Sequence, residues 1–452
     1  MNRKMIISVG MLLLATAGII PAQTSFTLKG CLDYAFSNNR SIRMANCDLE
    51  ISQKKVNEQI GNYLPQVNVS GSVDDNLELA KYLLPAEMMG GQPGTYVPVT
   101  FGTKYATTGT LQVTQKIVDP VSWLNIRSSG ISGEQSAQSL QKTREDVIYN
   151  ISTVYYQTLV VSKQAELLKT ILLASEQSLK SAELRFRNGM AKQIDIDKLR
   201  VSYNNTLAQV QQTDLRYAQL LNSLKYNLGM PVDSVLELAD TSLTAASLLF
   251  ENPPGHLLRV SEIIDYQIRE TSYSLTEYEK KKAAAVFYPV LSFYGNYGYN
   301  AWRQEFNFFD ADKEWYNSSA IGLRLTIPIF DGLQRSSRLA QSKLNLEKAR
   351  ENLSQTEQYI KVNASNYNMR YLNAMENINN ERENLRLAES VYRNTQLELR
   401  QGAGSTLDLI QAESSYVQAQ NNYFNKLLDL YIARLDLERA SGTLPSFIQH
   451  LK

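Results

Sequence analysis

The chain has 452 residues, of which 20% are charged, and its formal net charge is +1. This length allows about three ordinary domains. The balanced charge argues against the basic face of a nucleic-acid-binding protein and against an acidic tail, so we predict no nucleic-acid partner. Tyr is abundant at 26, whereas the chain has only 2 His and 2 Cys.

The N-terminus has the layout of a secretory signal peptide. Arg3 and Lys4 precede an apolar run over 5–20, and Ala22 offers a small residue for cleavage. The run is short for a transmembrane helix, and the alternative is a buried N-terminal helix. We therefore expect an exported chain that loses residues 1–22, with no helical anchor later on.

The two cysteines lie close together in the segment that follows. Cys31 stands well past the apolar run, too far from the expected cleavage site for a lipid-anchor cysteine. Its spacing from Cys47 leaves two interpretations open, a disulfide or two unpaired thiols.

Two segments of the chain repeat each other at a constant offset of 213 residues, which takes Gly189 to Gly402 and Gly229 to Gly442. Each copy contains a long stretch without proline that predicts one continuous helix. At 1.5 Å per residue, a helix of about 67 residues is a rod on the order of 100 Å long. Such a rod cannot curl round one compact core, so we expect it to lie beside other rods in a coiled coil.

Apolar residues follow a heptad spacing along both predicted rods. In each copy the step of seven is interrupted once by a step of four, from Val161 to Ala165 and from Ala374 to Ile378. A step of four is a stutter, which locally unwinds a supercoil. Its occurrence at equivalent places supports a true repeat. The shorter helices that follow each rod keep the seven-residue step as well.

Immediately before each rod the apolar period changes to two. Val67, Val69 and Val73 alternate with polar residues, as Leu323 and Leu325 do in the second copy. This pattern suits a half-buried sheet, or lipid-facing strands that line a wet lumen. One hairpin per copy gives four strands per chain, and the smallest membrane barrels have eight. If the strands span a membrane, several chains must share one barrel, because unpaired backbone groups are costly in lipid.

The two hairpin tips differ in composition. The first, at about 81–102, is rich in Gly and Pro. The second, at about 301–316, carries Trp302, Phe306, Phe308, Phe309 and Trp315 among charges. These aromatic residues predict either a belt at a membrane interface or a cluster that packs on itself.

Several motifs of the two copies resemble those of a known family, the TolC-like outer-membrane efflux proteins. NYLPQVNVSGS (62–72) and VFYPVLSFYGNYG (286–298) resemble the family's entry from helix to strand, and LTIPIFDG (325–332) resembles its exit. RFRNGMAKQIDIDKLR and ELRQGAGSTLDLIQAE resemble its glycine-marked turns at the periplasmic end. The likeness covers about 28–442. The first copy departs from the pattern at QKIVDPVS, where Pro120 replaces the glycine of the usual Asp-Gly.

The resemblance implies an α+β membrane protein that forms a homotrimer. Three chains would share a twelve-stranded transmembrane β-barrel, with four strands from each chain, continued by a twelve-helix coiled-coil α-barrel. The expected segments are a signal peptide at 1–22, a first repeat at 23–229 (helix, hairpin 64–118, long helix 121–187, helix 193–228), an equatorial linker at 230–262, a second repeat at 263–442 (helix, hairpin 289–330, long helix 333–400, helix 406–441) and a tail at 443–452.

The resemblance also assigns roles to the turns between paired helices. Asp408 and Asp195 match acidic positions at the pore entrance, where a trimer would form rings of three carboxylates that concentrate cations. The alternative is a helix N-terminal acid that complements the helix dipole. Gln411 replaces the family's usual second acid, which implies a weaker cation preference. Gly404 replaces a basic gate residue, so Lys192 and Gln411 become the gate candidates.

Small residues at the same turns match the family's docking surface for a periplasmic adaptor protein. They are Gly189, Met190, Ala191, Gly402, Ala403 and Gly404. Small side chains let a partner hairpin approach closely. Glycine at a helix end is also ordinary turn chemistry, and both explanations can hold together.

No residue pattern predicts catalysis. His256 lies in a Pro-Gly linker and His450 in the tail, away from any candidate constellation. The sequence has no Cys/His spacing typical of metal sites and no Gly-rich phosphate loop. A nucleophile, base and orienting residue are not recognisable either. We therefore predict no enzyme, no cofactor and no metal.

The function implied by the resemblance is a passive exit duct in the outer membrane that extends into the periplasm. It would serve a tripartite efflux or type I secretion system. Its partners would be outer-membrane lipid, a periplasmic adaptor (membrane fusion) protein and an inner-membrane pump of the RND, ABC or MFS type. The alternative is an exported structural coiled-coil protein without channel activity, because alternating strands alone also suit a soluble sheet.

Overall fold

The structure, a computed structural model, describes residues 25–239 and 258–450. The expected signal peptide at 1–22, His256 and much of the linker at 230–262 lie outside the described residues. The chain divides into two compact units. We call the first the helical unit (1–43, 143–259 and 360–452) and the second the sheet unit (44–142 and 260–359). Each unit takes segments from both repeats.

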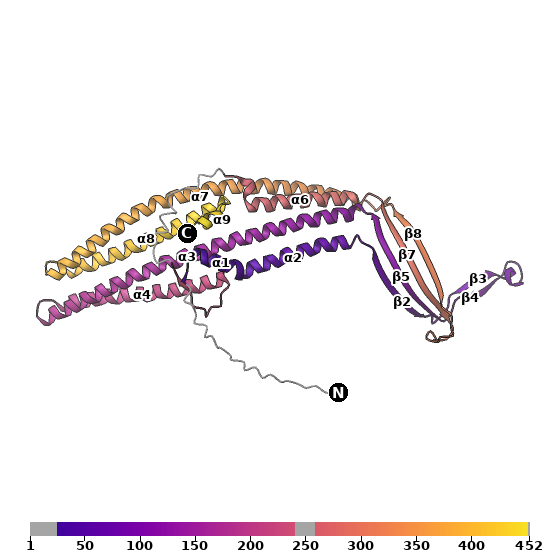
Figure 1. Ribbon diagram of the computed structural model, residues 1–452, viewed down its shortest axis with the longest axis horizontal. Helices are drawn as coiled ribbons and strands as arrows, with labels where there is room; N and C mark the ends of the chain where they lie inside the picture. Colours follow the sequence, from indigo (N-terminus) through magenta and orange to yellow (C-terminus); the bar gives the residue numbers. More distant parts are fainter. Residues whose placement is uncertain (1–24, 240–257, 451–452) are drawn as a thin grey trace, which may run out of the picture. The chain divides into compact units, whose positions relative to one another are not determined.

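The sheet unit is built on four antiparallel strands. These are β2 (Gln66–Asp75), β5 (Tyr105–Val118), β7 (Val290–Arg303) and β8 (Tyr316–Thr326), in the order β2-β5-β7-β8 (Figure 1). The central β5–β7 pair, in which Gly109 stands opposite Tyr299, joins the two repeats. Within the described residues, the outer edges of β2 and β8 pair with no further strand.

Apolar side chains on this sheet face outward without cover. Val67, Val69 and Val73 on β2 are exposed, and so are Leu323 and Ile321 on β8, the last with 82% of its surface accessible. A water-soluble sheet normally buries its apolar face, so an exposed one of this kind marks a surface that another molecule or lipid covers.

The first hairpin tip is more ordered than its Gly and Pro content predicts. Between β2 and β5 it forms a two-stranded ribbon of β3 (Lys81–Pro85) and β4 (Tyr96–Thr100), joined through a 3-10 turn, η1 (Ala86–Met89). Gly90, with φ +79°, ends that turn in the left-handed region. The rings of Tyr82 and Phe101 then meet edge to face at 6.0 Å.

The aromatic residues of the second tip divide into packed and exposed rings. The Phe306 ring packs against the rings of Phe308 at 5.6 Å and Tyr105 at 5.7 Å, so part of the group clusters on itself. Trp302 remains exposed, and Phe309 has 91% of its surface accessible. These two exposed rings remain available for a membrane interface.

Four helices connect to the sheet. α2 (Arg40–Gly61) and α6 (Ile264–Ala285) lead into β2 and β7, whereas α3 (Pro120–Arg187) and α7 (Gln334–Gln401) follow β5 and β8. A further 3-10 turn, η2 (Val260–Glu262), precedes α6. None of the helices within the described ranges is long and apolar enough to cross a membrane.

The start of α3 explains the departure at QKIVDPVS. Pro120 is the first helical residue, where the missing N–H costs nothing and the fixed φ suits the helix. The Asp119 side chain accepts hydrogen bonds from the backbone N–H groups of Val121 (3.1 Å) and Ser122 (3.3 Å), which caps the helix. The second copy turns instead through Gly332, with φ +65°.

Most of the buried apolar side chains among the described residues belong to the helical unit. It contains α1 (Leu28–Asn38), α4 (Gln193–Leu228), α8 (Thr406–Ala440) and α9 (Leu444–His450), with a short parallel pair of β1 (Ser25–Phe26) and β6 (Glu237–Leu238). The heptad residues on either side of both four-residue steps, Val161, Ala165, Ala374 and Ile378, are buried. The apolar stripe therefore continues through both stutters.

Cys31 on α1 is buried, whereas Cys47 on α2 is exposed, and no disulfide joins these two described residues.

Candidate functional site at the turns between the paired helices

The α3–α4 and α7–α8 turns have the same backbone conformation. Gly189 and Gly402 both adopt the left-handed region, with φ of +76° and +84°. The residue after each glycine donates its N–H to a carbonyl five positions earlier, Met190 to Arg185 (2.8 Å) and Ala403 to Glu398 (3.0 Å). This Schellman arrangement satisfies the last carbonyls of a helix, so turn chemistry alone accounts for the two positive-φ glycines.

Gly404 is required by close packing rather than by its φ angle. A Cβ atom at this position would lie 2.9 Å from the backbone nitrogen of Leu399 and 3.1 Å from the carbonyl carbon of Glu398. Both contacts are to backbone, which cannot move aside as a flexible side chain can. The turn therefore accepts no side chain where the resemblance leads one to expect a basic residue.

The two acidic residues occupy equivalent places in the helices that follow. Asp195 lies in the first turn of α4 and is half-buried, and Asp408 lies in the first turn of α8 and is exposed. The turns differ in their caps, because the Ser405 hydroxyl accepts from the N–H of Leu407 (3.2 Å) while the Lys192 side chain makes no capping bond. Both carboxylates lie where the positive end of a helix dipole favours them.

A cavity of about 500 Å³ joins the two turns and gathers part of the predicted set. Met190, Ala191, Asp195, Gly402 and Gly404 line it. Gly189, Ala403, Asp408 and both gate candidates do not. Beside it, the Arg185 guanidinium donates to the carbonyl of Arg400 at 2.8 Å, so the end of α3 is tied to the end of α7.

The two gate candidates lie apart from this tie. Lys192 and Gln411 are both exposed, and Lys192 forms no ion pair with any residue in the described part of the chain. A gating role for either residue therefore stays a prediction.

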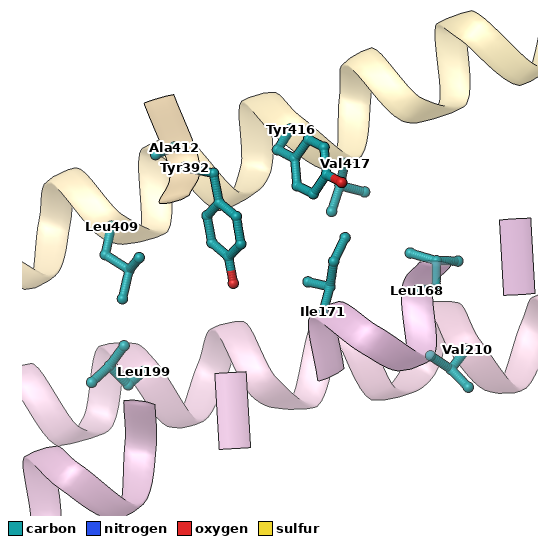
Figure 2. Packing of buried hydrophobic residues seen from close by; sticks show 9 residues of the cluster. All are labelled: Leu168, Ile171, Leu199, Val210, Tyr392, Leu409, Ala412, Tyr416 and Val417. Atoms are coloured by element: carbon teal, nitrogen blue, oxygen red, sulfur yellow. The ribbon is translucent and has the colours of Figure 1, made fainter. Parts of the chain in front are cut away.

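A second groove, of about 590 Å³, lies between α4 and α8, with the buried carboxylate of Glu413 among its lining residues. An apolar cluster from α3, α4, α7 and α8 packs beside it, and Figure 2 shows Leu409 of α8 pointing toward Leu199 of α4. In the same cluster the Tyr392 and Tyr416 rings stack at 5.4 Å.

Sequence reasoning missed Glu413. A signal was available in the repeat offset, which places Glu413 opposite Arg200, so the two copies carry opposite charges at this position. Arg200 is exposed and pairs with Glu183 on α3 at 3.0 Å. A heptad pattern shows that such a position borders the apolar stripe, but not that a neighbouring hairpin covers it.

Within residues 25–239 and 258–450, no group of three or more His, Cys, Asp or Glu side chains is placed to hold a metal ion. The geometry of the turns offers helix-end carboxylates, small residues and interhelical contacts. Carboxylates at helix ends can attract cations, and small residues leave room for a closely packed neighbour.

Four antiparallel strands continuous with paired long helices are a fold that solved structures share. The crystal structures of CusC, described in terms of folding and transmembrane channel formation, match with a TM-score of 0.75 at 15% identity, covering 92% of both chains. The chain therefore shares the fold of CusC.

The chain belongs to the outer membrane efflux protein family, whose model matches residues 31–230 and 272–443. Outer membrane efflux protein BepC of Brucella suis is 21% identical over 98% of this chain and 91% of its own length. Outer membrane protein TolC of Vibrio cholerae is 19% identical over 74% of this chain and 76% of its own. The family resemblance drawn from the sequence is confirmed, and with it a transport role in the outer membrane, reaching into the periplasm.

Proposed function

We propose that the protein is the passive exit duct of a tripartite efflux or type I secretion system. Three chains form a homotrimer in which the four-stranded sheets close into one twelve-stranded barrel. The paired helices continue it as a twelve-helix α-barrel. A periplasmic adaptor protein and an inner-membrane pump of the RND, ABC or MFS type deliver the cargo and supply the energy. The chain itself carries out no catalytic step.

The observation that carries this proposal is that the sheet formed by the described residues has unpaired edges and exposed apolar side chains. Its outer strands, β2 and β8, have unpaired outer edges within the described residues, and its apolar side chains are exposed. In lipid each unpaired backbone group costs several kcal/mol, so a spanning sheet must close. Four strands are too few for the smallest membrane barrel. Closure through neighbouring chains meets both requirements, because it pairs β2 of one copy with β8 of the next.

The turns supply the working parts of the duct's periplasmic end. In a trimer Asp408 and Asp195 form rings of three carboxylates, which raise the local concentration of cations. Gly189, Met190, Ala191, Gly402, Ala403 and Gly404 form the adaptor's docking surface. Lys192 and Gln411 contribute to the gate, and replacement of the family's second acid by Gln411 weakens the cation preference.

Fractionation tests this proposal against the alternative, an exported structural protein without channel activity. The full chain is expressed with its leader, the membranes are separated, and the chain is run on a denaturing gel with and without heating. The duct predicts outer-membrane protein that migrates as a trimer until it is heated. A soluble periplasmic monomer would contradict it.

A further inference from the structure

Glu413 joins the two helical hairpins through a buried polar contact. Only 3% of its surface is exposed. Its Oε1 atom accepts a hydrogen bond from the Thr206 hydroxyl at 3.1 Å and another from the Ser202 hydroxyl at 3.3 Å. Both hydroxyls belong to α4, whereas Glu413 belongs to α8, so the carboxylate links the helices that follow the two turns.

The contact lies close to the pore-entrance residues along α8. Leu409, one turn before Glu413, is buried in the cluster that contains Leu199 of α4 (Figure 2). Asp408 is the neighbour of Leu409 and is exposed. The position of Asp408 relative to α4 therefore depends on how the first turns of α8 are held against that helix.

The surroundings of Glu413 contain few other ionisable groups. From α4, Asp197 and Lys198 line the same groove, and both are exposed. From α7, Tyr392 lies near Glu413. Burial raises the pKa of Tyr392, and the negative charge of Glu413 raises it further. On α8 itself the nearest such group in the cluster is Tyr416. The cluster residues from α3 carry no ionisable group.

We propose that Glu413, Thr206 and Ser202 form a polar lock that holds α8 against α4 when the duct is closed, with Glu413 as a positioning residue for Asp408. The lock rests on the proposed function, because it supposes that these hairpins separate when the duct opens. It is separate from the gate candidates, which lie at exposed positions.

The lock responds to pH in a definite direction. Burial raises the pKa of Glu413, and the hydrogen bonds from Thr206 and Ser202 offset part of that rise. When the helices separate, the carboxyl group regains water and its pKa returns toward its ordinary value. Glu413 therefore binds its proton more tightly in the closed state than in the open state. Closure is favoured in acid and weakens as pH rises through the range above the ordinary glutamate pKa.

Planar-bilayer recording of the purified trimer tests the lock with three variants, each first shown to be a heat-modifiable trimer. Glu413→Gln keeps an acceptor oxygen for the two hydroxyls but cannot ionise. Thr206→Val removes the main donor at nearly constant volume. Thr213→Val is the matched control, because Thr213 is also buried on α4 but donates to Gln209 of its own helix at 2.8 Å.

The wild-type open fraction is expected to rise from about pH 5 to about pH 8, a range that lies above the ordinary pKa of glutamate. Glu413→Gln stays closed and loses this dependence. Thr206→Val opens about tenfold more readily at neutral pH, because it loses one hydrogen bond to a charged group. Thr213→Val behaves like the wild type.

Two results would overturn the lock while leaving the duct intact. One is that the wild type conducts and Glu413→Gln shows the same dependence of the open fraction on pH. The other is Thr206→Val that matches Thr213→Val in every record. If Thr206→Val does not assemble, the pH profile of Glu413→Gln decides alone. Failure of all variants and the wild type to conduct would instead contradict the proposed function, and the lock with it.

Discussion

At the scale of single residues, side-chain hydrogen bonds tie the helices of the helical unit together. The Tyr149 hydroxyl on α3 donates to the Asp436 carboxylate on α8 at 2.7 Å, and Arg370 on α7 reaches the same carboxylate at 3.1 Å. One half-buried tyrosine thus belongs to a junction of three helices. Burial and, next, the bond to Asp436 raise the pKa of Tyr149 to about 12.

Tyr149→Phe is expected to lower the free energy of unfolding by about 1 kcal/mol at neutral pH, because it leaves Asp436 with one partner fewer. The raised pKa gives this contribution a pH window. It is fully present below the ordinary tyrosine value of 10.0 and is lost as pH rises toward about 12. Denaturant titration of wild type and variant at several alkaline pH values should therefore show the difference shrinking.

Tyr226→Phe is the control for this prediction, since Tyr226 on α4 is exposed. It should match the wild type throughout. A Tyr149→Phe difference that stays constant across the alkaline range would show that the tyrosine's titration does not contribute.

At the scale of elements, the two long helices begin in different ways. Asp119 caps α3 and also accepts from the Lys116 ammonium group (2.8 Å) and the Ser122 hydroxyl (2.6 Å). Asp331, before α7, accepts from the backbone N–H and the side chain of Arg335 (3.0 and 2.7 Å). A carboxylate before the first turn is therefore common to both copies, although only the second has the Asp-Gly pair.

Asp119→Ala should destabilise the protein by about 1 to 2 kcal/mol, because it removes a helix cap and leaves Lys116 without its carboxylate. Asp119→Asn keeps an acceptor oxygen for the backbone N–H groups and should recover most of that loss. Thermal unfolding followed by far-ultraviolet circular dichroism distinguishes them. Equal losses in both variants would mean that the ion pair with Lys116, rather than the cap, stabilises this junction.

The elements also show what sequence periodicity can predict. Proline-free heptads predicted two long helices, and α3 and α7 run through those ranges. Alternation predicted the strands that became β2 and β8, since both signals depend on local spacing. The β3–β4 ribbon was not foreseen, because its strands are short and its turn is rich in glycine. The burial of Glu413 was missed for another reason, namely that it depends on a distant hairpin.

For the candidate site too, local features could be predicted from the sequence, whereas contacts between distant segments could not. The turn glycines could be recognised from sequence, because a helix end in the left-handed region favours glycine. The cavity that gathers Met190, Asp195 and Gly404 could not, because it depends on how two turns 213 residues apart in sequence meet. The residues of the turn likewise give no sign that a side chain at Gly404 would collide with backbone.

At the scale of the whole molecule, the repeat gives the chain a sheet that can be extended at both edges. The β5–β7 pair joins the two copies within one chain. The same antiparallel pairing, repeated between β2 of one chain and β8 of the next, would close three chains into a ring with no free edge. Closed rotational symmetry of this kind is the usual arrangement in homo-oligomers.

Ion conduction tests the duct most directly. Purified wild-type trimer, added to a planar lipid bilayer under a salt gradient, is predicted to give discrete channels whose reversal potential shows a modest cation preference. Asp408→Asn should reduce that preference, because it removes the charge of one carboxylate ring. An absence of conductance under every condition, including in Asp408→Ala, would contradict the account.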